Sequence, residues 1–289
     1  MFAIAVKQEQ YTTYVLSDEL SETKLEVVPE RGGIITSWQV KGQEMLYLDA
    51  ERFANPALTV RGGIPILFPI CGNLPDNTFR YKNQAYTLKQ HGFARDLPWE
   101  VGDRSTENQL SISLHLNSND QTRAVYPFDF QITFTYRLVG NSLQIYQRFT
   151  NTSSEPMPFS VGLHPYFNVT DKSQLQFDIP AAQGLNQRDQ TAYDFTGQFD
   201  FEADELDIAF LSVNQQSASV TDMSRKLRLT LQYDPIYSTL VFWTVKGKEF
   251  YCLEPWSAPR NALNSGTNLT HLDPGQTMEV LVRFIASFL

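Results

Sequence analysis

Cysteine is scarce in this sequence, which contains only Cys71 and Cys252. The two are too far apart to form a Cys-x-x-Cys zinc motif, and without a secretory signal they are expected to stay reduced thiols. The sequence also has no His-Glu-x-x-His motif, no Walker phosphate loop and no Gly-x-Gly-x-x-Gly fingerprint. These absences exclude the recognisable signatures of zinc peptidases, phosphate-loop nucleotidases and dinucleotide-binding enzymes.

Long apolar runs and an excess of basic residues are missing as well. No run approaches the roughly 20 apolar residues that cross a bilayer, and the apolar stretch at residues 1–6 is too short for a signal peptide. The net charge is -9 at pH 7, which argues against a nucleic-acid partner. We therefore expect a cytoplasmic protein with neither a membrane nor a nucleic-acid partner, although a few local arginines could still bind a small anion.

Amphipathic helices are absent too, because no long stretch combines helical periodicity with caps at both ends. Alternation of apolar and polar residues dominates instead. It predicts a half-buried strand at residues 130–138 and a second strand at 143–149. The intervening Gly140-Asn141 favours the φ > 0 positions of a tight turn, so the two strands are predicted to form a hairpin.

The remaining patterns predict more strands and very little helix. Further strands are expected at residues 110–116, 227–233, 239–245 and 278–288, the last closing the sheet. Residues 180–205 are polar and irregular, which predicts a long surface loop. The fold class expected is therefore all-β: a single domain, residues 1–289, of antiparallel strands in two packed sheets with few short helices.

His164 is the most conspicuous candidate for a functional side chain. Pro165 removes a backbone donor and disfavours helical angles at His164, so the imidazole is expected at a strand end or turn. Scaffolds commonly display reactive groups at such positions. By contrast, His115 on the polar phase of a strand and His271 in a loop are expected to be structural.

A second histidine and two arginines lie beside glycines. In Gln-His-Gly-Phe-Ala-Arg, Gly92 permits φ > 0 or a close backbone approach next to His91, and Arg95 adds a cation. The alternative is that His91 is a loop histidine held by a backbone carbonyl. Arg61 precedes two glycines, and the N–H groups of its guanidinium could donate hydrogen bonds to a hydroxyl or a phosphate.

Two carboxylates are candidates for acid–base work. Glu254 ends an apolar segment, and partial desolvation there would raise its pKa and make it a better base. The alternative is a strand-end glutamate paired with Arg260. Asp207 lies in an acidic stretch, where a carboxylate is usually only solvated. Two histidines with two carboxylates could in principle hold zinc, but no metal-site spacing supports a metal.

Four motifs in order resemble those of the aldose 1-epimerase (galactose mutarotase) family. They are Arg61-Gly-Gly-Ile-Pro65, His91-Gly-Phe-Ala-Arg95, Gly162-Leu-His-Pro-Tyr-Phe167 and Leu253-Glu-Pro-Trp256. The resemblance covers nearly the whole chain, and the first two motifs look most like the branch that contains hexose-6-phosphate 1-epimerases. It implies a large antiparallel β-supersandwich.

The resemblance also implies roles for individual residues. Glu254 matches the family's general base and His164 its general acid. His91 matches the second active-site histidine, which helps hold the substrate, and Asp207 resembles the substrate-binding aspartate.

Arg61 and Arg95 are then candidates for contact with the sugar or a phosphate, whereas Arg260 receives no role. The implied partner is a small-molecule sugar, free or phosphorylated, bound by a monomer or homodimer.

The implied chemistry suits these residue types. A carboxylate that takes the proton from O1, while an imidazolium protonates the ring oxygen, opens a pyranose to its aldehyde. Rotation about C1–C2 and closure with the roles reversed give the other anomer. Reference pKa values of roughly 4.3 for Glu and 6.5 for His bracket the required protonation states. No metal or other cofactor is expected.

Two other functions stay open on the sequence. A glycoside hydrolase would use Glu254 and Asp207 as carboxyls roughly 5 to 9.5 Å apart, and it gives His164 no necessary role. A non-catalytic sugar-binding module of the same fold would need neither an acid nor a base.

Overall fold

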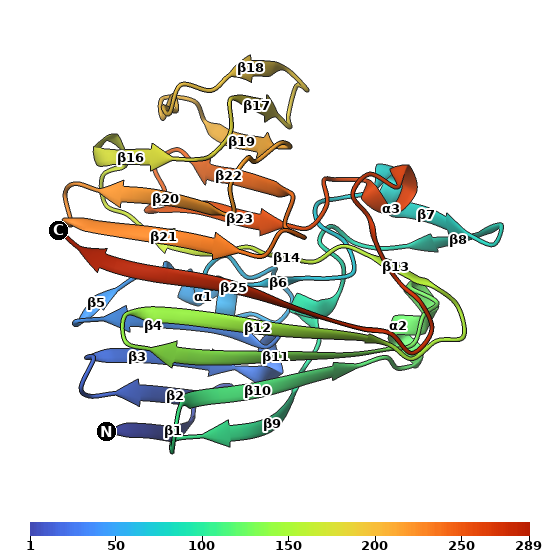
Figure 1. The fold of residues 1–289 in the computed structure, drawn as a ribbon, viewed down its shortest axis with the longest axis horizontal. Helices are drawn as coiled ribbons and strands as arrows, with labels where there is room; N and C mark the ends of the chain where they lie inside the picture. The colour runs from blue at the N-terminus through green and yellow to red at the C-terminus, as the bar shows by residue number, and fades with distance from the viewer.

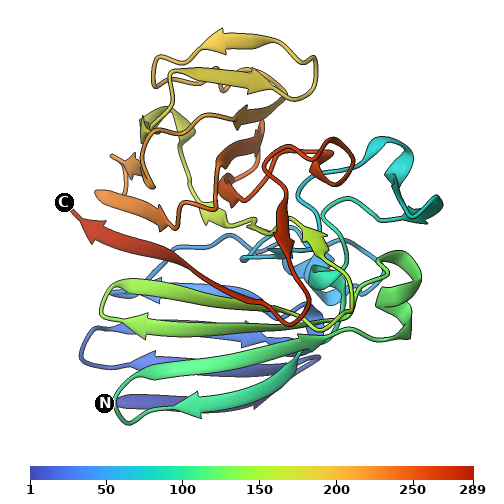
Figure 2. The ribbon, with the colours of Figure 1, turned by 45° about the vertical axis from the view of Figure 1, so that its right-hand side comes forward.

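Alternating apolar residues form strands along almost the whole chain in the computed structural model, which describes residues 1–289. The strands build two layers, seen from two directions in Figures 1 and 2. The paired strands run antiparallel throughout both layers, for example β11 with β12 (Phe130–Val139, Ser142–Asn151) and β22 with β23 (Thr239–Val245, Phe250–Trp256). The predicted all-β antiparallel sandwich is therefore confirmed.

One layer is an eight-stranded sheet that contains the predicted hairpin. In spatial order its strands are β16 (Leu175–Asp178), β20 (Ser217–Asp222), β21 (Leu227–Tyr233), β25 (Thr277–Phe288), β12, β11, β10 (Leu110–Asn117) and β9 (Glu100–Ser105). The register of β11 and β12 runs to Val139↔Ser142, directly at the Gly140-Asn141 turn. The hairpin prediction is confirmed.

The position of β25 differs from the expectation that residues 278–288 close the sheet, which is wrong. This strand pairs with β12 on one side and with β21 on the other, so it lies inside the sheet. Alternation could not reveal this, because interior and edge strands with one buried face show the same pattern.

The second layer contains the sheet that carries the candidate site, called the site sheet below. In spatial order its strands are β18 (Ala192–Asp194), β17 (Gln183–Asn186), β19 (Glu205–Phe210), β22, β23, β14 (Gly162–Leu163) and β6 (Ile66–Leu67), with β15 (Tyr166–Asn168) also paired to β23. A five-stranded sheet continues this layer through bridges such as Ile35↔Ile64. Its strands are β1 (Phe2–Gln8), β2 (Thr12–Asp18), β3 (Thr23–Val28), β4 (Ile34–Val40) and β5 (Gln43–Glu44).

Short elements connect the sheets. Two small two-stranded sheets are made by β7 (Thr78–Tyr81) with β8 (Gln84–Thr87), which form a hairpin, and by β13 (Met157–Phe159) with β24 (Thr270–Leu272), which are far apart in the sequence. The α-helices are α1 (Ala50–Ala54), α2 (Asp120–Val125) and α3 (Ala262–Ser265), and the 3-10 helices are η1 (Pro29–Arg31), η2 (Pro75–Asn77), η3 (Ala94–Asp96) and η4 (Lys172–Gln174). None of the helices is long and apolar enough to span a bilayer.

Residues 180–205 are not a plain surface loop, so that prediction is wrong. They contain β17 and β18, which extend the site sheet beyond β19. Aromatic side chains after the hairpin pack back onto the sheet, and Phe199 stacks on Phe242 with ring centroids 3.9 Å apart. The two strands are short and the phenylalanines irregularly spaced, which hid the pattern. This packing holds the segment beside the candidate site.

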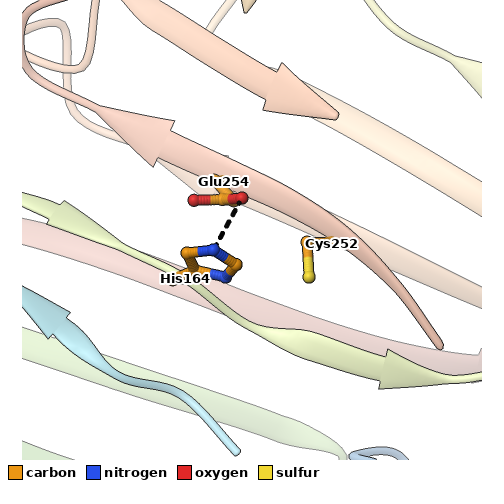
Figure 3. Close-up of side chains that lie close together, drawn as sticks. All are labelled: His164, Cys252 and Glu254. Atoms are coloured by element: carbon orange, nitrogen blue, oxygen red, sulfur yellow. Dashed lines mark ion pairs between the residues drawn. The ribbon is translucent and has the colours of Figure 1, made fainter. Parts of the chain in front are cut away.

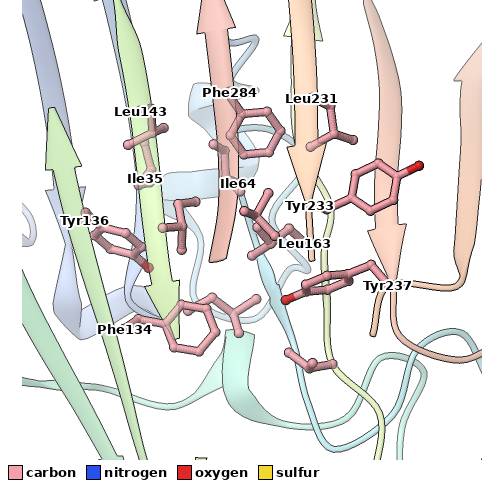
Figure 4. Packing of buried hydrophobic residues seen from close by; sticks show 14 of the residues in the cluster. Ile35, Ile64, Phe134, Tyr136, Leu143, Leu163, Leu231, Tyr233, Tyr237 and Phe284 are labelled. Atoms are coloured by element: carbon pink, nitrogen blue, oxygen red, sulfur yellow. The ribbon is translucent and has the colours of Figure 1, made fainter. Parts of the chain in front are cut away.

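A cluster of 57 buried residues fills the space between the layers, and Figure 4 shows part of it around Phe134 and Phe284. Two tyrosine hydroxyls inside it have partners: Tyr136 donates to the carbonyl of Gly33 at 2.6 Å, and Tyr237 donates to Oε1 of Gln147 at 2.7 Å. Because a buried unpaired hydroxyl costs about 1–3 kcal/mol, these bonds stabilise the packing. The inner faces are thus fixed, and the outer face of the site sheet is left to carry polar groups.

Candidate active site

A cavity of about 320 Å³ opens on the outer face of the site sheet. Strand parity determines which residues reach it, because successive side chains point to opposite faces. On β23, Glu254 and Trp256 point into the cavity, whereas Leu253 points into the core. Val241 of β22, which is paired with Glu254, also lines the cavity.

All six site residues predicted from the sequence line this one cavity. They come from five separate segments of the chain, with His91 and Arg95 in the same one, and are Arg61, His91, Arg95, His164, Asp207 and Glu254. The fold therefore brings together side chains that are far apart in the sequence.

His164 connects β14 to β15, both of which pair with β23. This is the strand-end position predicted from Pro165. The backbone N–H of His164 donates to the carbonyl of Pro65 at 3.0 Å, and its ring stacks on Tyr166 with centroids 4.7 Å apart. The ring is thereby aimed across the sheet, with Nε2 only 3.3 Å from Oε1 of Glu254.

Glu254 lies within β23 and is 1% exposed. Its Oε2 accepts a hydrogen bond from the indole Nε1 of Trp256 at 3.0 Å. The alternative of a strand-end pair with Arg260 is wrong, because Arg260 pairs with Asp207 at 2.8 Å. The carboxylate of Glu254 instead faces His164, as Figure 3 shows.

Glu254 and His164 are two titratable side chains in direct contact. Burial raises the pKa of the Glu254 carboxyl well above its ordinary value and lowers the pKa of His164. Both shifts disfavour the charged form of the group concerned, so burial favours a neutral carboxyl beside a neutral imidazole, a pair with one proton and no net charge. Two groups coupled this closely titrate together. The contact thus joins a group that can donate a proton to a group that can accept one.

The ring of His91 is held by a backbone N–H. The alternative expected from the sequence was that a backbone carbonyl would hold it. His91 has φ = 66° and is followed by Gly92 with φ = 70°, where a Cβ would lie 2.2 Å from the carbonyl oxygen of Phe68. Only glycine fits there. Nδ1 of His91 accepts a bond from the N–H of Gly72 at 3.0 Å, so in the neutral ring Nε2 carries the proton. Burial lowers the pKa of His91 well below its ordinary value, which makes the ring a neutral donor.

Asp207 belongs to a polar network that the sequence did not reveal. Its Oδ1 accepts from Nε2 of Gln187 at 2.7 Å, and its Oδ2 pairs with Arg260 at 2.8 Å. Arg260 also donates to Gln187 and to Asn73. Burial is the main cause that raises the pKa of Asp207. The network ties β19 to the β17–β18 segment and to the loop after β23, and it keeps Asp207 at the cavity wall.

The two arginines among the predicted residues differ in setting. Arg61 is exposed at the cavity, and its guanidinium lies over the ring of Trp243 at 5.1 Å. Arg95 is partly exposed in η3 and donates to the carbonyl of Gln90 at 2.9 Å. Trp243 was not predicted as a site residue, although it lies two residues after Val241 on β22 and therefore shares the cavity face.

Aromatic residues suggested by the motifs divide between site and core. Tyr166 and Trp256 line the cavity, whereas Phe93 packs against Phe130 in the core, with centroids 5.9 Å apart. The two histidines expected to be structural lie outside the cavity. His115 bonds Thr133 at 2.9 Å on the other layer, and His271 is exposed.

One trio has donor types that could hold a divalent cation. The ligand atoms of His164, Cys252 and Glu254 lie within 4.8 Å of one another (Figure 3). All three side chains are buried, and desolvation raises the pKa of the Cys252 thiol well above its ordinary value. A metal needs the thiolate, so this environment opposes metal binding.

Known proteins share this fold and much of this sequence. Residues 16–284 match the family described as Aldose 1-epimerase. The Slr1438 protein from Synechocystis sp. PCC 6803 is 46% identical, with each chain fully covered and a TM-score of 0.96. The chromosomal LacX protein of Lactococcus lactis subsp. lactis is 28% identical over 86% of this chain and 89% of its own. A Cenchrus ciliaris protein, provisionally named as a glucose-6-phosphate 1-epimerase, is 27% identical over 75% of this chain and 67% of its own.

Proposed function

Since the chain belongs to the aldose 1-epimerase family, we propose that it interconverts the α and β anomers of a hexose or hexose 6-phosphate by acid–base opening and closure of the pyranose ring. The observation that carries the proposal is the 3.3 Å contact between His164 Nε2 and Glu254 Oε1 in the cavity. A buried pair that holds one proton supplies the acid and the base that the reaction needs together. The shared core of 57 residues supports a single catalytic domain over residues 1–289.

In the proposed reaction Glu254 is the general base and His164 the general acid. Glu254 takes the proton from O1 while His164 gives one to the ring oxygen, and the C1–O5 bond breaks to leave the open-chain aldehyde. After rotation about C1–C2, O5 attacks the other face of C1. His164 then takes the proton back from O5 and Glu254 returns one to the new O1. Acid–base assistance of this kind contributes about 10² to 10⁴ in rate.

The other cavity residues are proposed to hold the sugar. His91 presents a neutral Nε2–H donor, and Asp207 keeps lone pairs for a hydroxyl although both its oxygens already accept one bond. Trp243 and Tyr166 offer ring surfaces to the apolar face of a pyranose. Arg95 supplies a cation close to the pair, since its charge acts on both His164 and Glu254.

The test of the function is anomer exchange. Pure α-glucose, α-galactose and glucose 6-phosphate are dissolved, and the approach to equilibrium is followed by polarimetry or NMR exchange with the spontaneous rate subtracted. Acceleration of at least one sugar without bond cleavage supports the proposal. Cleavage of an aryl glycoside would favour a hydrolase, and sugar binding without acceleration would favour a non-catalytic carbohydrate-binding protein.

Arg61 is proposed to recognise a 6-phosphate. With O1 at Glu254 and the ring oxygen at His164, the C6 arm leaves the ring from the His164 side. Arg61 lies on the same side. Its guanidinium carbon is 5.1 Å from the ring centroid of Trp243, and the Trp243 and His164 ring centroids are 5.7 Å apart. Arg260, in contrast, lies over Trp256 on the Glu254 side.

We therefore expect Arg61→Gln to change substrate preference. The catalytic efficiency kcat/KM for glucose 6-phosphate should fall about tenfold, because a charge-assisted contact to phosphate is lost, while that for glucose changes less than about threefold. Arg148→Gln, on the other layer, is the matched control and should change neither value. Equal losses on both sugars in Arg61→Gln would contradict phosphate recognition by this residue.

A further inference from the structure

Protein side chains engage both oxygens of the Glu254 carboxylate. His164 Nε2 lies 3.3 Å from Oε1, and the Trp256 indole donates to Oε2 at 3.0 Å. The three side chains are buried, with Glu254 and Trp256 each 1% exposed. An indole has one N–H and no acceptor, so Trp256 can only donate, whereas His164 can donate or accept.

The two contacts therefore act differently on the proton that the pair shares. His164 and Glu254 can exchange it along their contact without a change in net charge. The Trp256 N–H is always a donor, whichever residue of the pair holds the proton. It forms a stronger hydrogen bond with a carboxylate than with a neutral carboxyl. Its presence favours the form with the charge separated.

The fold gives the indole little freedom. Trp256 lies two residues after Glu254 on β23, so the two side chains share a face. The ring of His91 packs edge-on against the indole with centroids 5.5 Å apart. A Cβ at Gly162 would lie 2.8 Å from Cδ1 of Trp256, so the absence of a side chain at 162 makes room for the ring.

From this geometry we infer that Trp256 is a positioning residue: its indole N–H opposes the effect of burial on Glu254, favours the proton-accepting carboxylate and shifts the shared proton toward His164. The kinetic consequence rests on the proposed epimerase function, but the protonation state is a property of the ligand-free protein.

Other charged and titratable groups face Glu254 from several elements. They are Asp207 on β19, Cys252 on the same strand, Tyr166 on β15, Cys71 in the loop after β6, Arg95 on η3, Arg260 after β23 and His91 beside the indole. Asp207 opposes the carboxylate form, and the two arginines favour it through space. The hydrogen bond to the carboxylate comes from Trp256, and Arg260 directs its bonds to Asp207 and Gln187.

The test is Trp256→Phe, which keeps an aromatic ring and removes the N–H. A bond to a charged group shifts an ionisation equilibrium by about ten- to a hundredfold, or about one to two pH units. We expect kcat to fall by that factor and the acidic limb of the pH–kcat/KM profile to move to higher pH, with KM changed less than about threefold. Incorporation of benzothienylalanine at 256, in which sulfur replaces the N–H, gives the same comparison with the shape retained.

Trp99→Phe is the matched control, because this core tryptophan lies outside the cavity and donates its indole N–H to the carbonyl of Ala94 at 2.9 Å. It should leave the acidic limb in place. NMR of the His164 ring in ligand-free protein gives a readout that needs no turnover, and the imidazolium fraction at pH 7 should be lower without the Trp256 N–H.

An acidic limb of the pH profile that stays in place in both Trp256 variants, an equal shift of that limb in Trp99→Phe, or equal imidazolium fractions would each overturn the inference. A wild-type protein that accelerates no anomer exchange would refute the proposed function instead, and the NMR comparison would still decide the role of Trp256.

Discussion

Replacing Glu254 by Gln is expected to lower kcat for anomer exchange by about 10³, within the range of about 10² to 10⁴ for a positioned acid or base. The amide has nearly the shape of the carboxylate but cannot take the proton from O1. Single-turnover or NMR exchange rates of the variant measure the loss.

The same substitution should also change how stability depends on pH. Above about pH 6.5 the unfolded chain has released the protons of both residues, whereas the folded Glu254–His164 pair still holds one. Folding then takes up a proton, so wild-type stability falls as the pH rises through the raised pKa of the pair. In Glu254→Gln the folded His164 is already neutral, because burial lowers its pKa. The decline should disappear.

Thermal unfolding from pH 6.5 to 8.5 tests whether the stability of the wild type falls with rising pH and that of Glu254→Gln does not. The melting temperature of Glu254→Gln should stay flatter than that of the wild type over this range. Glu155→Gln, which removes an exposed ion pair with Lys82, is the control and should retain wild-type activity and slope. Wild-type turnover in Glu254→Gln would remove the base assignment, whatever the thermal data show.

His164→Asn is expected to be the other severe variant, with kcat lowered about 10² to 10⁴. Asparagine cannot protonate the ring oxygen, and Glu254 loses the partner with which it shares a proton. Because the two residues act as a unit, the double variant with Glu254→Gln should be little slower than the worse single variant. Fully additive losses would mean that the two side chains act independently.

A matched control separates the general effect of losing a histidine from the loss of the general acid His164. His115 lies on the other layer, where it bonds Thr133 at 2.9 Å. His115→Asn should therefore keep kcat within about twofold of the wild type, because a surface substitution away from the site changes little. Circular dichroism of all variants shows whether the fold is retained.

Local chemistry made some of the site predictable. Pro165 restricts the backbone before it, and His164 lies at a strand end as that restriction indicated. Gly92 has positive φ and a neighbour too close for any Cβ, as its place beside His91 suggested. The alternation of residues 130–138 and 143–149 fixed a hairpin because both its strands and its turn are specified within about twenty residues.

Local sequence patterns could not predict side-chain contacts between distant segments of the chain. Arg260 meets Asp207 only because the loop after β23 returns to β19, and Gln187 joins them from a segment whose strands are too short to show alternation. The bond from Trp256 to Glu254 was more accessible. Residues i and i+2 of any strand share a face, so that contact required only the assignment of residues 250–256 to a strand.

The central place of β25 has a consequence for biosynthesis. Strands β9–β12 leave the ribosome early, yet β12 gains its second neighbour only when residues 277–288 emerge and pair with it. Until then β12 offers an open row of amide and carbonyl groups to other nascent chains. The half of the sheet that is synthesised first therefore cannot complete its pairing until synthesis of the chain ends. We expect chaperones that cover the open edge of β12 to reduce aggregation of the nascent chain.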